Sequence, residues 1–249
     1  MLIFSPQYTK LPGRSESTNH NVYLIGRMDY DTLTFTPEGP YRHLDYGFDF
    51  YAAQAAANVA DADRAILIAW IGLPDNHYPT EEEDREGSLS LPRELRVKGG
   101  RLVQTPLEAL SALRGAERPA DGDHPEACEL DIDVTGDDFR LSLFAREGGE
   151  GGLKLSYDAA TRTCTVDKTG LDRRFNQAVG EALRMPLETP LRRLRVFVDR
   201  SSVELFANDG EATFTVHVYP TERERGLRVV GGQARLWPLS AAVKNPFVF

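Results

Sequence analysis

The residues best suited to chemistry lie together in the segment Leu44-Asp-Tyr-Gly-Phe-Asp-Phe-Tyr-Ala-Ala-Gln54. A strand over 45–52 would turn four residues to one face, because side chains alternate along a strand: Asp45, Gly47, Asp49 and Tyr51. Carboxylates and a phenol can hold sugar hydroxyls, an aromatic ring can stack on a sugar ring, and a glycine allows close approach. The same alternation is typical of a half-buried antiparallel strand with a solvated acidic face, and periodicity alone favours that interpretation.

Carboxyl spacing argues against catalysis by these residues. Glycoside hydrolysis needs two carboxyl groups about 5 Å apart for retention of configuration and roughly 6.5–9.5 Å apart for inversion. Asp45 and Asp49 would stand about 13 Å apart on one strand, which fits neither geometry. Asp199 and Glu204 flank an expected turn, where stabilisation of the turn is the favoured role. The sequence therefore offers no convincing catalytic pair.

The sequence contains no motif for metal binding, nucleophilic catalysis or phosphate binding by a glycine-rich loop. The five histidines have no metal-ligand spacing, no serine or cysteine sits in a nucleophile motif, and no glycine-rich loop could cradle phosphate. We therefore expect neither a metal nor a cofactor. Arg93 and Glu94 are expected to form a buried ion pair that braces the fold.

Composition limits the partners. The 249 residues carry a net charge of −9, which speaks against nucleic acid and anionic membranes. No apolar run approaches the ~20 residues of a membrane span, and no signal peptide opens the sequence. Cys128 and Cys164 lack metal-ligand spacing and fit buried strand positions, which favours reduced thiols in a cytoplasmic protein.

Strand-like runs separated by turn residues fill residues 1–104 and predict consecutive antiparallel strands. The candidates are 2–4, 22–25, 32–35, 48–52, 66–70 and 102–103. Thr105-Pro-Leu-Glu108 predicts the start of a short helix, with threonine as cap and proline at the first helical position. This helix, within 105–117, is expected to link two domains.

Residues 118–249 predict a second domain. Apolar and polar residues alternate in 128–134, 141–143 and 153–157, and again in 194–198, 203–207 and 214–218. Asn208-Asp-Gly210 predicts a hairpin turn. Many short strands at near-regular intervals predict a β-sandwich. Residues 167–189 break the rhythm, and we expect a long loop there with a short helical piece.

An ordered set of motifs resembles glycoside hydrolase family 32, the family of invertases, sucrose-6-phosphate hydrolases and related fructosidases. The motifs are Ser5-Pro-Gln7, Leu24-Ile-Gly26, Leu44-Asp-Tyr-Gly-Phe-Asp-Phe-Tyr-Ala52, Ala69-Trp70, Tyr78-Pro-Thr80, Leu91-Pro-Arg-Glu-Leu95, Gln104-Thr-Pro106, Val196-Phe-Val-Asp-Arg-Ser-Ser-Val-Glu-Leu-Phe-Ala-Asn-Asp-Gly-Glu211 and Val218-Tyr-Pro220. The resemblance implies an all-β fold, with the last portion of a five-bladed β-propeller in 1–104 and a C-terminal β-sandwich in 118–249. Glu86-Gly-Ser-Leu-Ser90 departs from the Gly-Trp segment usual there.

The resemblance also implies a sugar site. Tyr51 and Trp70 match aromatic positions that line the family's fructose pocket, and Asp45 on the polar face is a further candidate for sugar contact. Aromatic residues in strands are more often core than site, so packing remains the alternative for both rings. The implied ligand is a fructose-containing sugar, namely sucrose, sucrose-6-phosphate or a fructan.

Three family segments do not occur in the sequence: Trp-Met-Asn-Asp-Pro-Asn with the nucleophile, Arg-Asp-Pro with the stabiliser, and Glu-Cys with the acid/base. The chain thus resembles the C-terminal half of a retaining β-fructofuranosidase and is expected to be inactive alone. A separate chain could supply the other half, or uncovered blade edges could drive self-association. The alternative function is a non-catalytic module for sugar binding or oligomerisation.

Overall fold

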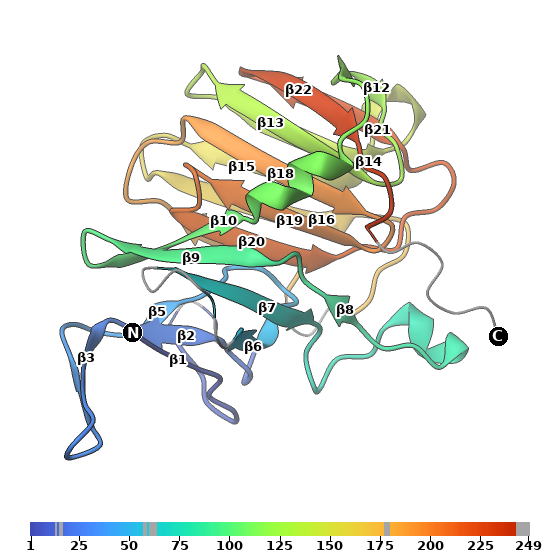
Figure 1. The fold of residues 1–249 in the computed structure, drawn as a ribbon. Helices are drawn as coiled ribbons and strands as arrows, with labels where there is room; N and C mark the ends of the chain where they lie inside the picture. The colour runs from blue at the N-terminus through green and yellow to red at the C-terminus, as the bar shows by residue number, and fades with distance from the viewer. Residues whose placement is uncertain (13, 15–16, 57–58, 60–63, 177–179, 243–249) are drawn as a thin grey trace.

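The structure is a computed structural model that describes residues 1–12, 14, 17–56, 59, 64–176 and 180–242. Apart from three short 3₁₀ helices, the regular elements in these residues are strands, which confirms the all-β prediction. The strands form two stacked regions, one from the first 106 residues and one from the residues after 117 (Figure 1). Among the described residues, no helix has the length and apolar character to cross a membrane.

The first region contains small antiparallel sheets. One has the order β1-β2-β5: β1 (Leu2–Phe4), β2 (Val22–Leu24) and β5 (Arg42–His43). A separate hairpin consists of β3 (Gly26–Asp29) and β4 (Thr34–Pro37). The largest has the order β10-β9-β7-β6, with β8 beside β7: β6 (Tyr51–Ala55), β7 (Ala65–Ile71), β8 (Ser88–Leu89), β9 (Arg93–Lys98) and β10 (Arg101–Pro106). The 3₁₀ helix η1 (Pro79–Glu83) precedes β8.

Little apolar surface is buried inside this first region. Its core cluster consists of Tyr23, Leu44, Phe50, Leu67, Ala69, Leu95 and Leu102. Large apolar side chains also remain in solvent, among them Leu89 at 73% exposure and Val97 at 50%. Leu89 pairs with Trp70 across β7 and β8, so together with Ile68, at 40% exposure, it lies on a sheet face that no apolar layer covers in the described residues. Val97 lies on the opposite face, where it is in register with the buried Leu102.

Two predictions for this region are wrong. Residues 45–50 are not a strand, and β6 begins only at Tyr51. The backbone of this segment bonds across to the second region instead, with the Tyr46 N–H donating to the Thr213 carbonyl at 2.9 Å. The predicted cap at Thr105 also fails, because Thr105 still pairs with Glu94 inside the β9–β10 ladder. The 3₁₀ helix η2 (Glu108–Leu113) begins later and lacks a side-chain cap.

Two six-stranded sheets form the second region. One has the order β11-β22-β13-β18-β19-β20: β11 (Arg118–Pro119), β22 (Gly232–Pro238), β13 (Cys128–Val134), β18 (Arg193–Asp199), β19 (Ser202–Ala207) and β20 (Ala212–His217). The other has the order β12-β21-β14-β15-β16-β17: β12 (Gly122–Asp123), β21 (Gly226–Val230), β14 (Arg140–Ala145), β15 (Gly152–Asp158), β16 (Thr163–Gly170) and β17 (Ala182–Pro186). The short 3₁₀ helix η3 (Glu147–Gly149) lies between β14 and β15.

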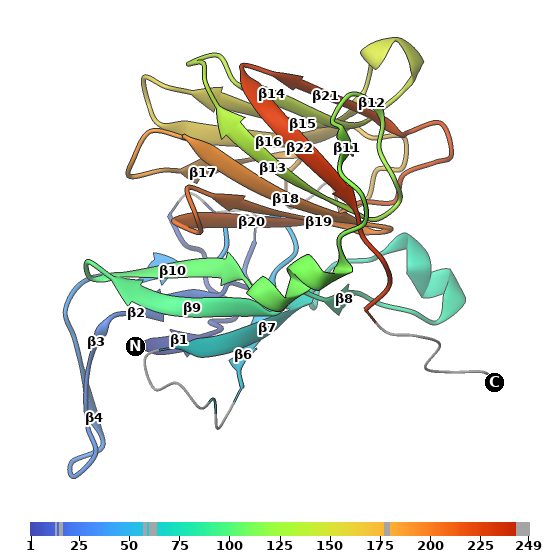
Figure 2. The same ribbon diagram turned by 45° about the horizontal axis from the view of Figure 1, so that its top comes forward.

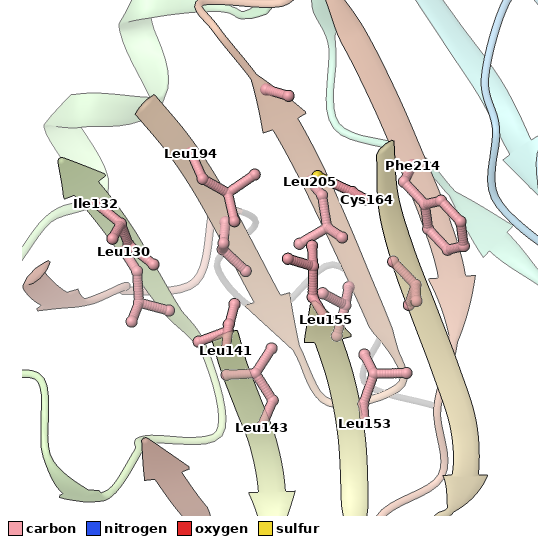
Figure 3. Close-up of a cluster of buried hydrophobic side chains, with 14 of the residues drawn as sticks. Leu130, Ile132, Leu141, Leu143, Leu153, Leu155, Cys164, Leu194, Leu205 and Phe214 are labelled. Atoms are coloured by element: carbon pink, nitrogen blue, oxygen red, sulfur yellow. The ribbon is translucent and has the colours of Figure 1, made fainter. Parts of the chain in front are cut away.

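One apolar core fills the space between these sheets, as Figure 3 shows for residues such as Leu130, Leu155 and Leu205. The predicted β-sandwich is therefore confirmed, together with the hairpin turn between β19 and β20. The loop predicted over 167–189 is wrong in part, because β16 continues to Gly170 and β17 spans Ala182–Pro186. The five residues of β17 do alternate, with Leu183 and Met185 against the core and Ala182, Arg184 and Pro186 exposed, but the strand is short and lies at the edge of its sheet.

The two regions meet along β20. Strands β7 and β10 of the first region lie beside the β19–β20 edge of the sandwich (Figure 2). This edge would otherwise expose unpaired backbone groups, which the segment after Leu44 satisfies from the first region. The contact between regions is therefore where polar side chains gather.

Candidate functional site

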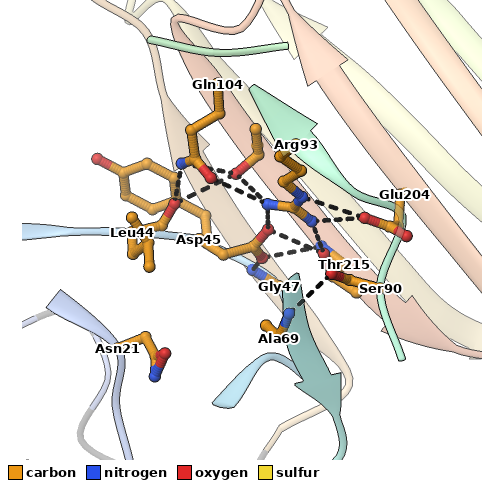
Figure 4. A network of polar contacts seen from close by, with 12 residues as sticks. Asn21, Leu44, Asp45, Gly47, Ala69, Ser90, Arg93, Gln104, Glu204 and Thr215 are labelled. Carbon is orange, nitrogen blue, oxygen red and sulfur yellow. Dashed lines mark hydrogen bonds and ion pairs between the residues drawn. The ribbon is translucent and has the colours of Figure 1, made fainter. Parts of the chain in front are cut away.

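A buried guanidinium lies at the centre of the contact between the regions. Arg93 in β9 has no exposed surface, and five side chains from both regions surround it (Figure 4). It donates to Glu204 at 2.7 Å, Asp45 at 3.0 Å, Thr215 at 2.7 Å, Thr213 at 3.1 Å and Gln104 at 3.2 Å. All its donors are thus directed at fixed acceptors, with the Phe50 ring 4.3 Å below the guanidinium carbon.

Asp45 completes this network rather than facing solvent. Its carboxylate accepts hydrogen bonds from the Thr215 N–H at 2.9 Å, the Thr215 hydroxyl at 2.8 Å and the Gly47 N–H at 2.7 Å, besides the Arg93 bond. No surface of the Asp45 side chain is exposed. A sugar hydroxyl has no free face of this carboxylate to approach, so the geometry gives no support to sugar binding by Asp45.

Electrostatics in this cluster are tightly coupled. Burial alone acts to lower the pKa of Arg93, but the facing carboxylates of Glu204 and Asp45 raise it overall, so the guanidinium stays charged. Burial raises the pKa of Glu204, which shares the single cation with Asp45. Because each charge is buried, the cluster is stable only while its members remain together.

Two sequence interpretations change here. The ion pair predicted between Arg93 and Glu94 is wrong, since Arg93 pairs with Asp45 and Glu204 while Glu94 bonds Arg64 and Arg96. Glu204 does more than support a local turn: it accepts from the Leu91 N–H at 2.6 Å and so joins the sandwich to the first region. The role remains structural.

Asp49 makes a second polar link. Its carboxylate accepts from the Tyr78 hydroxyl at 2.9 Å and from the His217 N–H at 2.8 Å. Burial, with the adjacent Asp49 charge, raises the pKa of Tyr78, so the phenol remains a hydrogen-bond donor. The His217 ring reaches the Ile71 carbonyl at 2.7 Å from its Nε2 atom. Asp45 and Asp49 thus both serve the contact between regions.

Tyr51 and Trp70 lie together at the end of β7. The two residues are direct cross-strand partners in the β6–β7 ladder, where facing side chains are neighbours. Tyr51 is buried, and burial raises the pKa of its phenol, although a hydrogen bond with Gln7 opposes that rise. Trp70 is half-buried, so one part of its ring system remains accessible.

Two glycines hold the indole of Trp70. A Cβ on Gly72 would stand 2.3 Å from Trp70 Cε2, and one on Gly87 would stand 2.0 Å from Trp70 Nε1. Gly87 also has a φ of +70°, which disfavours any other residue. The indole of Trp70 therefore packs closely against the backbone at both glycines.

Polar residues that the sequence analysis did not select lie near this pair. Asn19 donates to Asp75 at 2.7 Å, and the Asp75 charge acts on the Tyr51 phenol. Gln7 belongs to a motif shared with the family but was assigned no role. The motif could therefore have pointed to Gln7, whereas Asn19 and Asp75 lie in segments whose sequence has no periodic pattern.

Around Tyr51 and Trp70, the described residues include no pair of carboxylates arranged for hydrolysis. Asp45 and Asp49, the carboxylates closest in sequence to Tyr51, are held in the contact between the regions. Within the described part of the chain, no cluster of three or more His, Cys, Asp or Glu residues could hold a metal ion. The geometry supports an aromatic wall beside a braced interface.

Comparison with protein families places both regions. Residues 1–106 match the model described as "Glycosyl hydrolases family 32 N-terminal domain". Residues 94–242 match the model described as "Glycosyl hydrolases family 32 C terminal". The first region is thus the end of the family's N-terminal propeller domain, and the sandwich is its C-terminal domain.

Curated relatives agree with these matches. The chain is 33% identical over 241 residues to a sucrose-6-phosphate hydrolase of Staphylococcus xylosus, covering 92% of this chain and 48% of the relative. It is 32% identical over 241 residues to a raffinose invertase of Escherichia coli, covering 91% of this chain and 48% of that protein. The chain therefore spans about half the length of the curated relatives it matches.

Solved structures share the fold. A sucrose-6-phosphate hydrolase from Lactobacillus gasseri superposes with a TM-score of 0.81 at 27% identity, over 90% of this chain and 49% of that one. A β-fructofuranosidase from Bombyx mori superposes with a TM-score of 0.79 at 24% identity, over 95% of this chain and 51% of that one, which shows the fold alone.

Proposed function

Because the chain belongs to glycosyl hydrolase family 32, we propose that it forms the C-terminal portion of a β-fructofuranosidase that hydrolyses sucrose or sucrose-6-phosphate with retention. The observation that carries the proposal is the fixed pair of Tyr51 and Trp70 at the end of β7. In this proposal Trp70, which is half-buried, presents an aromatic face to the sugar in the fructose pocket, and the buried Tyr51 packs beside it in the same wall.

Catalysis would come from residues outside this sequence. None of the three family segments with nucleophile, stabiliser and acid/base occurs among the 249 residues. The carboxylates of Asp45, Asp49 and Glu204 are already hydrogen-bonded in the contact between the regions, so they would not replace the three missing catalytic carboxylates. In this proposal the chain contributes to substrate binding and to the sandwich, and a complete propeller supplies the carboxylates.

An assay of sugar release tests this division. The purified chain, its mass confirmed, is incubated with sucrose and with sucrose-6-phosphate, and released fructose is measured. We expect no release. Turnover that survives repurification would contradict the proposal and would make Asp45 and Asp49 the first residues to substitute.

Sugar titration tests the aromatic wall directly. We expect weak saturable binding of fructose or short fructans, lost in Tyr51→Ala and in Trp70→Ala. Tyr30→Ala is the matched control, because Tyr30 lies in the same region with 80% of its surface exposed. Binding that survives both substitutions would move the site to the sandwich and favour a non-catalytic sugar-binding module.

The exposed apolar residues favour a partner for the first region. Every exposed large apolar side chain in the described residues except Val230 lies within the first 97 residues. We propose that a chain with the N-terminal half, or a second copy of this chain, covers them. Sedimentation distinguishes self-association, and mixing with a chain carrying the three segments tests complementation by gain of hydrolysis.

A cytoplasmic location fits the two cysteines and remains part of the proposal. Cys128 and Cys164 are free and buried, and burial raises the pKa of each thiol to about 12. Such thiols stay protonated and inert at neutral pH and need no oxidising compartment. Cell fractionation with an antibody to the chain would test it, and recovery in a secreted fraction would contradict it.

A further inference from the structure

A cavity of about 290 Å³, lined by both polar and apolar residues, opens between the two regions next to the β9–β10 hairpin. Its lining from the first region includes Tyr23, Arg42, Tyr46, Lys98 and Arg101. The facing wall comes from the sandwich, where Glu188 follows β17 and Glu211 precedes β20. The volume far exceeds the roughly 10–15 Å³ that one water needs, so the cavity could take a small molecule.

Cations in this cavity are poorly neutralised. Arg42 and Arg101 both pair with the same oxygen, Glu188 Oε1, and the Arg42 distance is 3.3 Å. Lys98 makes no ion pair to a carboxylate in the described part of the chain, and it faces Arg101 across the ladder. Two guanidinium groups therefore share one carboxylate oxygen, while Lys98 has no carboxylate partner in the described residues.

Glu211 offsets part of this positive charge, since it acts on Arg101, but its oxygens make their hydrogen bonds elsewhere. Its carboxylate accepts hydrogen bonds from the backbone N–H groups of Glu188 and Thr189, from the Thr189 hydroxyl at 2.5 Å, and from the Asn208 amide at 3.2 Å. Burial acts to raise the pKa of Glu211, but these bonds lower it overall. The Glu211 charge is thus directed at the sandwich loop.

The remaining polar groups are mostly donors. No hydrogen bond from the hydroxyl of Tyr23 or Tyr46 is present within the described residues, although both rings line the cavity. Burial raises the pKa of Tyr46, so its hydroxyl keeps its proton. Burial, assisted by the Arg14 charge, lowers the pKa of His43 to about 4, so that ring is neutral. Two guanidinium groups, an ammonium and two phenols therefore line one cavity, against the two carboxylates of Glu188 and Glu211.

We propose that this cavity binds a small oxyanion, in the form of inorganic phosphate or the phosphate group of a small metabolite. Guanidinium forks match the oxygens of such a group, and a lysine adds a point charge. Glu188 occupies the position of the anion in the absence of ligand and is displaced from Arg42 and Arg101 when the anion binds.

This site is separate from the aromatic wall. Lys98 and Arg101 stand at the tip of the β9–β10 hairpin, whereas Trp70 pairs with Leu89 at the far end of β7. Substitution of Tyr51 or Trp70 should leave anion binding unchanged. Failure of the fructosidase proposal and failure of this one are thus distinguishable.

Calorimetric titration of the full chain with inorganic phosphate and with glucose 6-phosphate tests the proposal, with glucose as the uncharged control. We expect saturable binding of phosphate-bearing ligands and none of glucose. Lys98→Gln and Arg101→Gln should each weaken binding by about tenfold, because each removes one cation from the anion. Arg27→Gln, an arginine whose side chain is 90% exposed, is the matched control and should have no effect.

The direction in which Glu188→Gln changes the affinity for phosphate is the decisive result. Removal of the competing carboxylate should strengthen phosphate binding, an outcome that a purely structural role for Glu188 does not produce. Unchanged tryptophan fluorescence would show that each variant folds. Binding of both probes would identify a phosphorylated metabolite, and binding of inorganic phosphate alone a free anion. Absence of binding to every variant, equal binding of glucose, or weaker binding in Glu188→Gln would overturn the proposal.

Discussion

The sandwich buries a continuous apolar core between two six-stranded sheets, whereas the first region buries a small cluster and relies on polar contacts with its neighbour. Apolar burial is non-directional and spreads over many side chains, so single losses are shared. A buried charge cluster is directional and fails when one member is removed. The two regions should therefore respond differently to substitution.

Arg93→Ala should produce the largest difference in stability between the two regions. It would leave Asp45 and Glu204 buried without their cation, at a cost of about 3–5 kcal/mol. The two tryptophans report separately, since Trp70 lies in the first region and Trp237 in β22 of the sandwich. Each tryptophan is followed by fluorescence in a variant in which the other tryptophan is replaced by Phe. In Arg93→Ala we expect the unfolding midpoint reported by Trp70 to fall at a much lower denaturant concentration than the midpoint reported by Trp237.

The exposed pair of Arg27 and Glu38 supplies the control for that experiment. Arg27→Ala should change stability by less than about 1 kcal/mol, because water screens exposed ion pairs. Coincident and unshifted transitions in Arg93→Ala would show that the polar cluster does not hold the first region.

Leu205→Ala should act on both regions together. Leu205 in β19 is 1% exposed within the sandwich core, and its truncation should cost about 2–5 kcal/mol. Because the first region rests on the β19–β20 edge, both tryptophan signals should shift to lower denaturant. Val230→Ala, at a half-exposed position, is the control. A Trp70 transition unaffected by Leu205→Ala would show that the first region stands alone.

Gly47→Ala tests the close backbone approach at the contact between the two regions. A Cβ on Gly47 would stand 1.8 Å from the Thr215 carbonyl oxygen, so the two backbones must separate. We expect a loss of about 1–3 kcal/mol, as in overpacked cores, confined to the Trp70 transition. Gly39→Ala is the matched control, because nothing lies within 4 Å of its Cβ position. Equal effects of the two substitutions would contradict the close approach.

The smallest expected effect is a pH dependence of the sandwich. Burial acts to raise the pKa of Asp131, but hydrogen bonds from Arg193 hold it below the ordinary value. A carboxyl with a lower pKa in the folded state stabilises above its unfolded pKa, about 3.9, and loses that contribution as pH falls through the folded pKa. Asp131→Asn should remove about 1 kcal/mol at neutral pH, because water screens the half-exposed arginine partners.

Acid titration of unfolding, followed by Trp237, measures this effect. Below pH 4 the wild-type chain and Asp131→Asn should converge in stability. Asp137→Asn, at an exposed position, is the control and should track the wild-type chain throughout. Curves that stay parallel down to low pH would contradict a linked proton at Asp131.

Strands with one face against the apolar core were predictable from the sequence. In β13 the apolar Cys128, Leu130 and Ile132 face the core in alternation, as the pattern predicted. Burial of Glu129 and Asp131 on the other face, against arginine side chains, was not predictable from the alternation. The segment after Leu44 has a similar alternating sequence, but its alternation has a different structural origin. Phe48 packs in the sandwich core and Phe50 in the first region, so its residues are divided between two partners rather than two faces.

The site was predictable only in part. Tyr51 and Trp70 were selected by resemblance, and their pairing across β6 and β7 follows from neither residue alone. The role of Asp45 depends on Arg93 and Thr215, which are distant in sequence and bear no local signal of the contact. Short-range patterns report which face is buried, but they do not report which partner buries it.

The Arg93 cluster also sets an order of events during synthesis. Arg93 and Thr215, which share a hydrogen bond, are 122 residues apart in sequence. At about 5–20 residues per second, the ribosome needs on the order of 10 s to make the intervening chain. The first region therefore leaves the ribosome with its central cation still hydrated, and its final packing must wait for β20. A nascent chain paused before residue 215 should present this region to chaperones and proteases in an unlocked state.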